Sequence, residues 1–275
     1  MTTTIVTGAT SGIGLEISKQ LAAHGHNLIL ISRSHNKLKD LREKLISVYS
    51  IDCEIYCIDL SICQSNLQTV EKIIKSKTVV DILINNVGAI FMNRILTPEG
   101  IEKTFALNHM SYFIMSSRLI NHYDNLKIIN VSSAAHRNIK LNTSDLQNRL
   151  NYSGWHAYKR SKLANIYLSY ELHRRYSEKG HTINCLHPGV VNTNFANNNS
   201  FIYKIAASII KYFGISSSEG AKTPVYLATN NDIADISGLY FDNCYPKKTS
   251  LISYDVSIAQ KLWDYSEILL NDEYV

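Results

Sequence analysis

The chain has 275 residues, of which 45% are hydrophobic, and a formal net charge of +5. A chain of this length and composition can bury one full core, so we expect a single domain spanning residues 1–275. Its 28 lysines and arginines are scattered rather than gathered in runs, which disfavours a nucleic-acid partner.

Cysteine usage and hydropathy predict a soluble protein in a reducing, cytoplasmic setting. The five cysteines form no CxxC pair, and the N-terminus does not read as a signal peptide. No apolar run reaches the roughly 18 residues that a transmembrane helix needs. The ten histidines form no HxxxH or HExxH motif, so we expect no metal.

The chain alternates short β-branched runs with longer amphipathic stretches, a pattern typical of a parallel sheet with crossover helices. Apolar residues recur at helical spacing in Ile13–Ala23 and in Lys37–Val48, which predicts two surface helices. The predicted strands are Thr2–Thr7, Asn27–Ile31, Cys53–Ile58, Ile82–Asn85, Lys127–Val131, Thr182–Leu186 and Gly238–Phe241.

A glycine-rich turn, Thr7-Gly8-Ala9-Thr10-Ser11-Gly12-Ile13-Gly14, follows the first predicted strand and opens the first helix. Glycines here allow a tight turn and a close approach of the backbone to a pyrophosphate, which the free N–H groups of the helix would bind. Glycines also occur in such turns for packing alone, but this context favours a dinucleotide. The predicted contacts are Gly8, Thr10, Ser11, Gly12, Ile13 and Gly14.

The spacing TGxxxGxG resembles that of the short-chain dehydrogenase/reductase family. Asn85-Asn86-Val87-Gly88 is similar to its NNAG motif, with Val87 in place of alanine, and Tyr158-Lys159-Arg160-Ser161-Lys162 is similar to its YxxxK signature. His187-Pro188-Gly189 resembles its PG motif. The resemblance implies an α/β fold with one doubly wound Rossmann-fold sheet of about seven parallel strands, flanked by helices. It also implies cofactor contacts at Asn85, Gly88, Tyr158, Lys162, Pro188, Gly189, Val191 and Thr193.

The residues at the end of the second predicted strand indicate which nicotinamide cofactor binds. The family resemblance implies an acidic residue there in NAD-preferring members, whereas this chain has Ser32 followed by Arg33. A hydroxyl beside a guanidinium suits a 2′-phosphate, so we expect NADP(H) in preference to NAD(H). The alternative is that Arg33 is only a solvated residue at a strand end.

Asp59 and Leu60 follow the third predicted strand. The resemblance implies that both contact the adenine and that Asp59 hydrogen-bonds the base. Alternatively, Asp59 is the N-cap of a helix whose segment starts at Ser61.

Tyr158 is the expected general acid and base. A tyrosine can exchange protons near neutrality only if its pKa falls from about 10. Lys162 lies four residues later on a predicted helix, so both side chains share one face, where an ammonium would stabilise the phenolate.

Ser133 and Asn108 complete the catalytic set that the resemblance implies. Ser133 would hold the substrate oxygen, with the adjacent Ser132 as its rival. Asn108 would support a water that relays protons to Lys162, or would be a helix amide bonded to backbone.

Further motifs resemble the branch of retinol-dehydrogenase-like and WW-domain-oxidoreductase-like proteins. They are Thr97-Pro98-Glu99-Gly100-Ile101-Glu102, Ser132-Ser133-Ala134-Ala135-His136, Ser161-Lys162-Leu163-Ala164-Asn165 and Gly238-Leu239-Tyr240-Phe241. We expect neither an N-terminal membrane anchor nor a WW module, which leaves retinoid specificity open.

Residues 192–218 would form a lid over the substrate. Within them, Phe201–Phe213 has apolar residues at helical spacing, which indicates a lid, a membrane-surface contact or an ordinary packed helix. The oligomeric state stays open.

The sequence therefore predicts an enzyme that transfers a hydride between NADP(H) and a small-molecule alcohol or carbonyl. The substrate is expected to be lipophilic: retinoid-, steroid- or aldehyde-like. Two alternatives remain: a catalytically silent NADP-binding sensor or scaffold, and a reductase of acyl or sugar intermediates.

Overall fold

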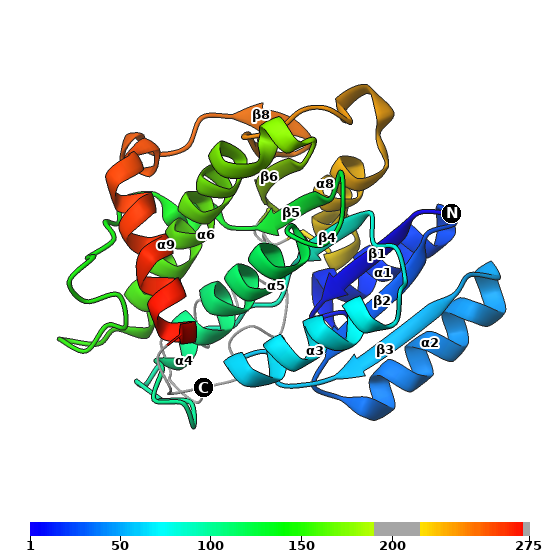
Figure 1. The fold of residues 1–275 in the computed structure, drawn as a ribbon, viewed down its shortest axis with the longest axis horizontal. Coiled ribbons are helices and arrows are strands. Elements are labelled where there is room, and N and C mark those ends of the chain that lie inside the picture. Colours follow the sequence, from blue (N-terminus) through cyan, green and yellow to red (C-terminus); the bar gives the residue numbers. More distant parts are fainter. Residues whose placement is uncertain (190–214, 272–275) are drawn as a thin grey trace.

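The structure is a computed structural model that describes residues 1–189 and 215–271. Its eight described strands form one sheet in the order β3-β2-β1-β4-β5-β6-β7-β8 (Figure 1). Neighbouring strands are parallel except β7 and β8, which pair antiparallel. The strands are β1 Thr3–Thr7, β2 Asn27–Ser32, β3 Cys53–Cys57, β4 Ile82–Asn85, β5 Lys127–Val131, β6 Thr182–His187, β7 Tyr240–Asp242 and β8 Tyr245–Lys247.

Seven of these strands match the predicted ones to within two residues at each end, and the α/β doubly wound class is confirmed. The eighth strand, β8, was not predicted. All three of its residues are exposed and the middle one is Pro246, so it carries no apolar pattern.

Helices cover both faces of the sheet, which explains why the central strands are apolar on both sides. Helices α1, α2 and α8 bury their apolar residues on one face, and α3, α5, α6 and α9 on the other. The α-helices are α1 Gly12–Ala23, α2 His35–Tyr49, α3 Cys63–Lys75, α4 Lys103–Phe105, α5 Ser111–Leu119, α6 Gly154–Tyr176, α8 Ser217–Thr229 and α9 Val256–Asn271. The predicted helices Ile13–Ala23 and Lys37–Val48 lie within α1 and α2.

The strand order reverses direction beside β1, since β2 lies on one side of it and β4 on the other. The crossover connections diverge at this point, so a crevice forms at the carboxyl ends of β1 and β4. In an open parallel sheet this is the place where a ligand binds. The residues after these two strands are the glycine-rich turn and the Asn85–Gly88 segment.

Some predicted features lie outside the described residues. These are Val191, Thr193, all but the last four residues of the 192–218 lid, and the 201–213 helix. Of the lid, Ile215–Ser218 is described, and α8 begins at Ser217. Within residues 1–189 and 215–271, no helix has the length and apolar character needed to cross a membrane.

Candidate cofactor and catalytic site

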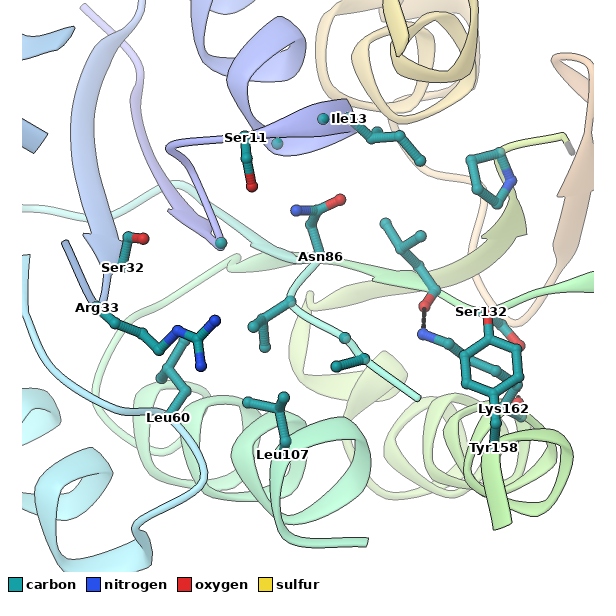
Figure 2. A pocket seen from close by; sticks show the side chains of 18 of the residues that line it. Ser11, Ile13, Ser32, Arg33, Leu60, Asn86, Leu107, Ser132, Tyr158 and Lys162 are labelled. Carbon is teal, nitrogen blue, oxygen red and sulfur yellow. Dashed lines mark hydrogen bonds between the residues drawn. The ribbon is translucent and has the colours of Figure 1, made fainter. Parts of the chain in front are cut away.

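A cavity of about 370 Å³ lies at the carboxyl ends of the central strands. Figure 2 shows Ser32, Arg33 and Leu60 toward one end and Tyr158 and Lys162 toward the other, with Ser11 and Ile13 along one wall. The predicted residues that line the cavity are Gly8, Ser11, Gly12, Ile13, Gly14, Ser32, Arg33, Leu60, Gly88, Tyr158, Lys162 and Pro188.

The glycine-rich turn needs glycine at specific positions. Gly8 and Gly12 have φ values of +70° and +53°, in the left-handed region that side chains disfavour. A Cβ on Gly14 would lie 2.2 Å from the carbonyl oxygen of Gly8, so the helix can approach the strand only without one. Ser11 is the N-cap residue of α1, but in the described part of the chain its side chain accepts no hydrogen bond from the first turn of the helix. The N–H groups at this N-terminus are therefore available to an anion.

The end of β2 lies at the end of the cavity that is opposite Tyr158. Thr10 Oγ1 lies 2.6 Å from Ser32 Oγ, a hydrogen bond that joins the glycine-rich turn to this strand. Thr10 therefore supports the wall rather than lining it. The Arg33 side chain extends beside Leu60 toward the cavity (Figure 2).

Asn86, rather than the predicted Asn85, lines the cavity. Asn85 ends β4 with its side chain buried, where its Nδ2 donates to Ser116 Oγ and to Asn130 Oδ1, both at 2.9 Å. Asn86 Nδ2 donates to the Thr7 carbonyl oxygen at 2.9 Å, which ties this segment to the end of β1. Successive strand residues point to opposite faces, so only one of the two amides can face the cavity.

Asp59 is absent from the cavity wall and is engaged in a local turn. Its Oδ1 accepts hydrogen bonds from the backbone N–H of Ser61 at 2.9 Å and from Ser61 Oγ at 2.8 Å. The helix begins at Cys63 rather than Ser61, and Glu99 caps it by accepting from Cys63 N and Gln64 N, both at 2.8 Å. The capping alternative was therefore wrong about which carboxylate caps the helix.

Tyr158 and Lys162 lie one turn apart on α6, and both are buried. Lys162 Nζ donates to the Val131 carbonyl oxygen at 2.9 Å and lies 5.8 Å from the centre of the Tyr158 ring. Burial raises the pKa of Tyr158 to about 12, opposed by a hydrogen bond with Ser133. Burial also lowers the pKa of Lys162 to about 7.

The two serines after β5 make different contacts. Ser132 Oγ donates to the Lys162 carbonyl oxygen at 2.7 Å, and this serine also lines the cavity. Ser133 hydrogen-bonds Tyr158, and its Oγ accepts from Ala135 N at 3.1 Å. Of the two, Ser133 is the serine in contact with the Tyr158 hydroxyl.

Asn108 lies in a π-helical segment, Ala106–Met110, between α4 and α5. Its side chain exchanges hydrogen bonds with the backbone of Ala89, both at 2.9 Å, and donates to Ser161 Oγ at 3.0 Å. A Cβ on Gly88 would lie 3.3 Å from Lys162 Nζ and 3.5 Å from Asn108 Oδ1. Gly88 therefore lets Asn108 and Lys162 approach the same backbone.

The predicted Gly189 lies outside the cavity wall, whereas several unpredicted residues line it. Gly189 has a φ of +92° after Pro188, and it does not line the cavity. Asn86 and Val87 belong to the Asn85–Gly88 motif, and Ser132 was the rival of Ser133. The other unpredicted lining residues carried no sequence signal for the site, because only the fold brings them together. The unpredicted lining residues are Asn86, Val87, Ala89, Phe91, Leu107, Val131 and Ser132.

Comparisons with known proteins place the chain in one family. The chain matches the short chain dehydrogenase family over residues 2–201. It is 35% identical to retinol dehydrogenase 13 from Homo sapiens, over 98% of this chain and 85% of that protein. It is 32% identical to a WW domain-containing oxidoreductase from Drosophila melanogaster, over 98% of this chain and 68% of that protein. A crystal structure of an uncharacterized protein from Mycobacterium Paratuberculosis matches with a TM-score of 0.80 and 26% identity, covering 100% of this chain and 95% of that one.

A doubly wound sheet with a glycine-rich turn at its switch point defines a dinucleotide-binding fold. More particularly, the chain belongs to the short-chain dehydrogenase family, whose members bind a nicotinamide cofactor. The branch that its motifs predicted, with retinol dehydrogenases and WW domain-containing oxidoreductases, is confirmed by these relatives.

Proposed function

We propose that this protein is an NADP(H)-dependent reductase or dehydrogenase that interconverts a lipophilic carbonyl compound and its alcohol. The observation that carries the proposal is the arrangement along one cavity. Tyr158 and Lys162 line one end, where Ser133 hydrogen-bonds Tyr158 without itself lining the cavity, and Ser32 and Arg33 line the other end, with no carboxylate among the described lining residues.

The residues present fit a dinucleotide phosphate. The Gly8–Gly14 turn presents backbone where no Cβ is tolerated, and the unblocked N-terminus of α1 favours an anion beside it. Arg33 supplies a planar cation and Ser32 a hydroxyl at the end of the cavity away from Tyr158, where the adenosine phosphate would lie. Lys162 and Tyr158 would hold the nicotinamide ribose, and the bound cofactor would supply the hydride.

Tyr158 acts as the proton donor in carbonyl reduction. Burial raises its pKa instead of lowering it as expected from the sequence, so at neutral pH the phenol is in its acid form, and the positive charge of Lys162 is needed to favour transfer of its proton to the substrate oxygen. The Ser133 hydroxyl, already bonded to Tyr158, would hold the same oxygen. The charged form of Lys162 would stabilise the phenolate that remains.

Apolar side chains in the cavity wall support a lipophilic substrate. Phe91, Leu107, Val131 and Pro188 line the cavity together with the two reactive side chains. Apolar walls with few polar groups are typical of sites that take apolar small molecules. The cytoplasmic location and the single-domain organisation stay predictions.

Tyr158→Phe tests the catalytic assignment. Loss of a general acid typically costs 100-fold to 10,000-fold in rate, so we expect NADPH-dependent reduction of aldehydes to fall by at least about 100-fold. NADPH binding, measured by calorimetry, should stay within about threefold, because the phosphate contacts remain. Tyr49→Phe, at the exposed end of α2, is the matched control. Retained turnover in Tyr158→Phe would refute the assignment.

If the wild-type protein binds NADPH tightly and reduces no aldehyde or ketone of any chain length, the protein is a cofactor-binding sensor or scaffold instead. A preference for acyl or sugar carbonyls in the same panel would refute the lipophilic substrate. Spectrophotometric NADPH oxidation across aldehydes and ketones of rising chain length, and across sugars, separates these outcomes.

Arg33→Ala tests the cofactor preference. A hydrogen bond to a charged group contributes about 1.5 to 3 kcal/mol, so the KM for NADPH should rise about 10-fold to 100-fold. The KM for NADH, which lacks the 2′-phosphate, should change little. Lys37→Ala removes a neighbouring cation in the first turn of α2 and should have a much smaller effect. Equal KM values for NADPH in Arg33→Ala and the wild type would contradict the preference.

A further inference from the structure

Trp155 stands beside the proton donor in the first turn of α6, three residues before Tyr158. Its ring stacks on the Tyr158 ring with centroids 5.7 Å apart and an interplanar angle of 24°. Tyr158 is 9% exposed, whereas Trp155 is 47% exposed. The indole therefore extends the aromatic surface of the reacting residue outward to solvent.

The backbone that carries Trp155 is held in place. A Cβ on Gly154 would lie 2.3 Å from the Phe91 carbonyl oxygen and 2.7 Å from Met92 Cα, so the start of α6 packs directly on this segment. Ser153 Oγ accepts from His156 N and caps the same turn. A tryptophan has only two side-chain torsions, so a fixed backbone makes it a rigid surface with little entropy to lose on binding.

Trp155 adjoins the reacting groups through its stacking on Tyr158, although it is not among the described residues that line the cavity. Phe91, on which the start of α6 packs, lines the cavity with Tyr158. A substrate that places its oxygen on the Tyr158 hydroxyl brings the group next to its carbonyl close to the Tyr158 ring. The indole stacked on that ring is the surface that such a group meets toward solvent.

We infer that Trp155 is a specificity-determining residue that forms one wall of the substrate site. It favours carbonyl compounds whose neighbouring group is flat, apolar and aromatic over saturated groups of equal size. A flat ring offers full face or edge contact to an indole, whereas a puckered ring offers less. This inference rests on the proposed function.

Benzaldehyde and cyclohexanecarbaldehyde form the matched pair of probes, since both have a six-membered ring and differ in flatness. The measured quantity is the ratio of kcat/KM for the two aldehydes with saturating NADPH. We expect Trp155→Ala to lower this ratio about threefold to tenfold, the range that aromatic pairs contribute. The loss should fall on KM for benzaldehyde, and Trp155→Phe should restore most of the ratio.

Tyr49→Ala is the control, an exposed aromatic at the end of α2 that should leave the ratio at the wild-type value. An unchanged ratio in Trp155→Ala would overturn the inference and leave the proposed function standing. An equal fall in kcat for both aldehydes would also overturn it, because Trp155 would then only support the position of Tyr158.

A binding measurement covers the case in which the proposed function fails. The chain has two tryptophans, and Trp263 is 7% exposed with the Arg175 guanidinium 4.3 Å from its ring centre. The emission lost in Trp155→Phe therefore reports on Trp155. With NADP⁺ present, benzaldehyde should quench this emission more than cyclohexanecarbaldehyde does. Without any turnover, such quenching would still support the aromatic wall, and its absence would overturn it.

Discussion

Burial sets the protonation states of the two reactive residues on α6 in opposite senses. It disfavours every charged form, so it raises the pKa of the Tyr158 phenol to about 12 and lowers that of the Lys162 ammonium to about 7. Near neutrality the phenol keeps its proton, while the lysine divides between charged and neutral forms. Near neutrality, therefore, the phenol of Tyr158 holds a proton that it can donate, and the charge on Lys162 is what changes with pH.

We expect carbonyl reduction to slow as pH rises through about 7. Below that pH, Lys162 is charged and stabilises the phenolate that forms on Tyr158; above it, the charge is lost, while Tyr158 stays protonated up to about 12. Lys162→Arg keeps a cation at all these pH values and should remove the fall. The measurement is kcat/KM for aldehyde reduction with NADPH from about pH 5.5 to 9. Histidines, with an ordinary pKa of about 6.5, also titrate in this range, so the profile needs a control that separates them from Lys162.

Lys162→Met is the matched control for this profile. It removes the titrating group, so its low residual rate should not depend on pH in this range. A fall near pH 7 that persists in Lys162→Met would assign the titration to another group. His136 and His187 are the neighbouring histidines, and burial lowers the pKa of both.

At the residue scale, sequence motifs found the cavity but did not distinguish neighbours within a motif. Asn85 and Asn86 belong to one motif, yet only Asn86 faces the cavity because the backbone alternates at the strand end. Thr10 lies in the glycine-rich turn, but its hydroxyl hydrogen-bonds Ser32 and does not line the cavity. Such choices depend on side-chain direction, which a residue pattern leaves open. The roles of Ser133 and Asn108 stay predictions.

At the element scale, local periodicity was enough for the strands of the parallel sheet and for α1 and α2. Their signals are apolar runs and helical spacing within one segment. The π-helical turn Ala106–Met110 had no such signal, since it continues α4 into α5 within one buried segment that mixes apolar and polar residues. The start of α3 was missed for another reason. Its cap is Glu99, 36 residues from Cys63, and a cap supplied from such a distance leaves no local pattern.

At the scale of the whole molecule, α9 joins the end of the chain to the catalytic helix. It packs on α6 and contributes to the core that α3 and α5 also form (Figure 1). Trp263 of α9 meets the Phe113 ring of α5 edge-on, with centroids 4.9 Å apart, and the Arg175 guanidinium of α6 lies 4.3 Å from the centre of the Trp263 ring. One side chain therefore connects three helices on this face of the sheet.

Trp263→Ala should lower the free energy of unfolding by about 3 to 5 kcal/mol, because it removes a large buried aromatic and leaves a cavity between the helices. Urea denaturation followed by circular dichroism measures this loss as a lower midpoint with an unchanged slope. Leu251→Ala, at a side chain that is 89% exposed, should change the stability by less than about 0.5 kcal/mol. The folded fraction of Trp263→Ala should keep the wild-type KM for NADPH, since α9 adds no residue to the cavity wall. A loss below about 1 kcal/mol would mean that the packing of α9 on α5 and α6 contributes little to stability, and that the remaining core holds the catalytic helix alone.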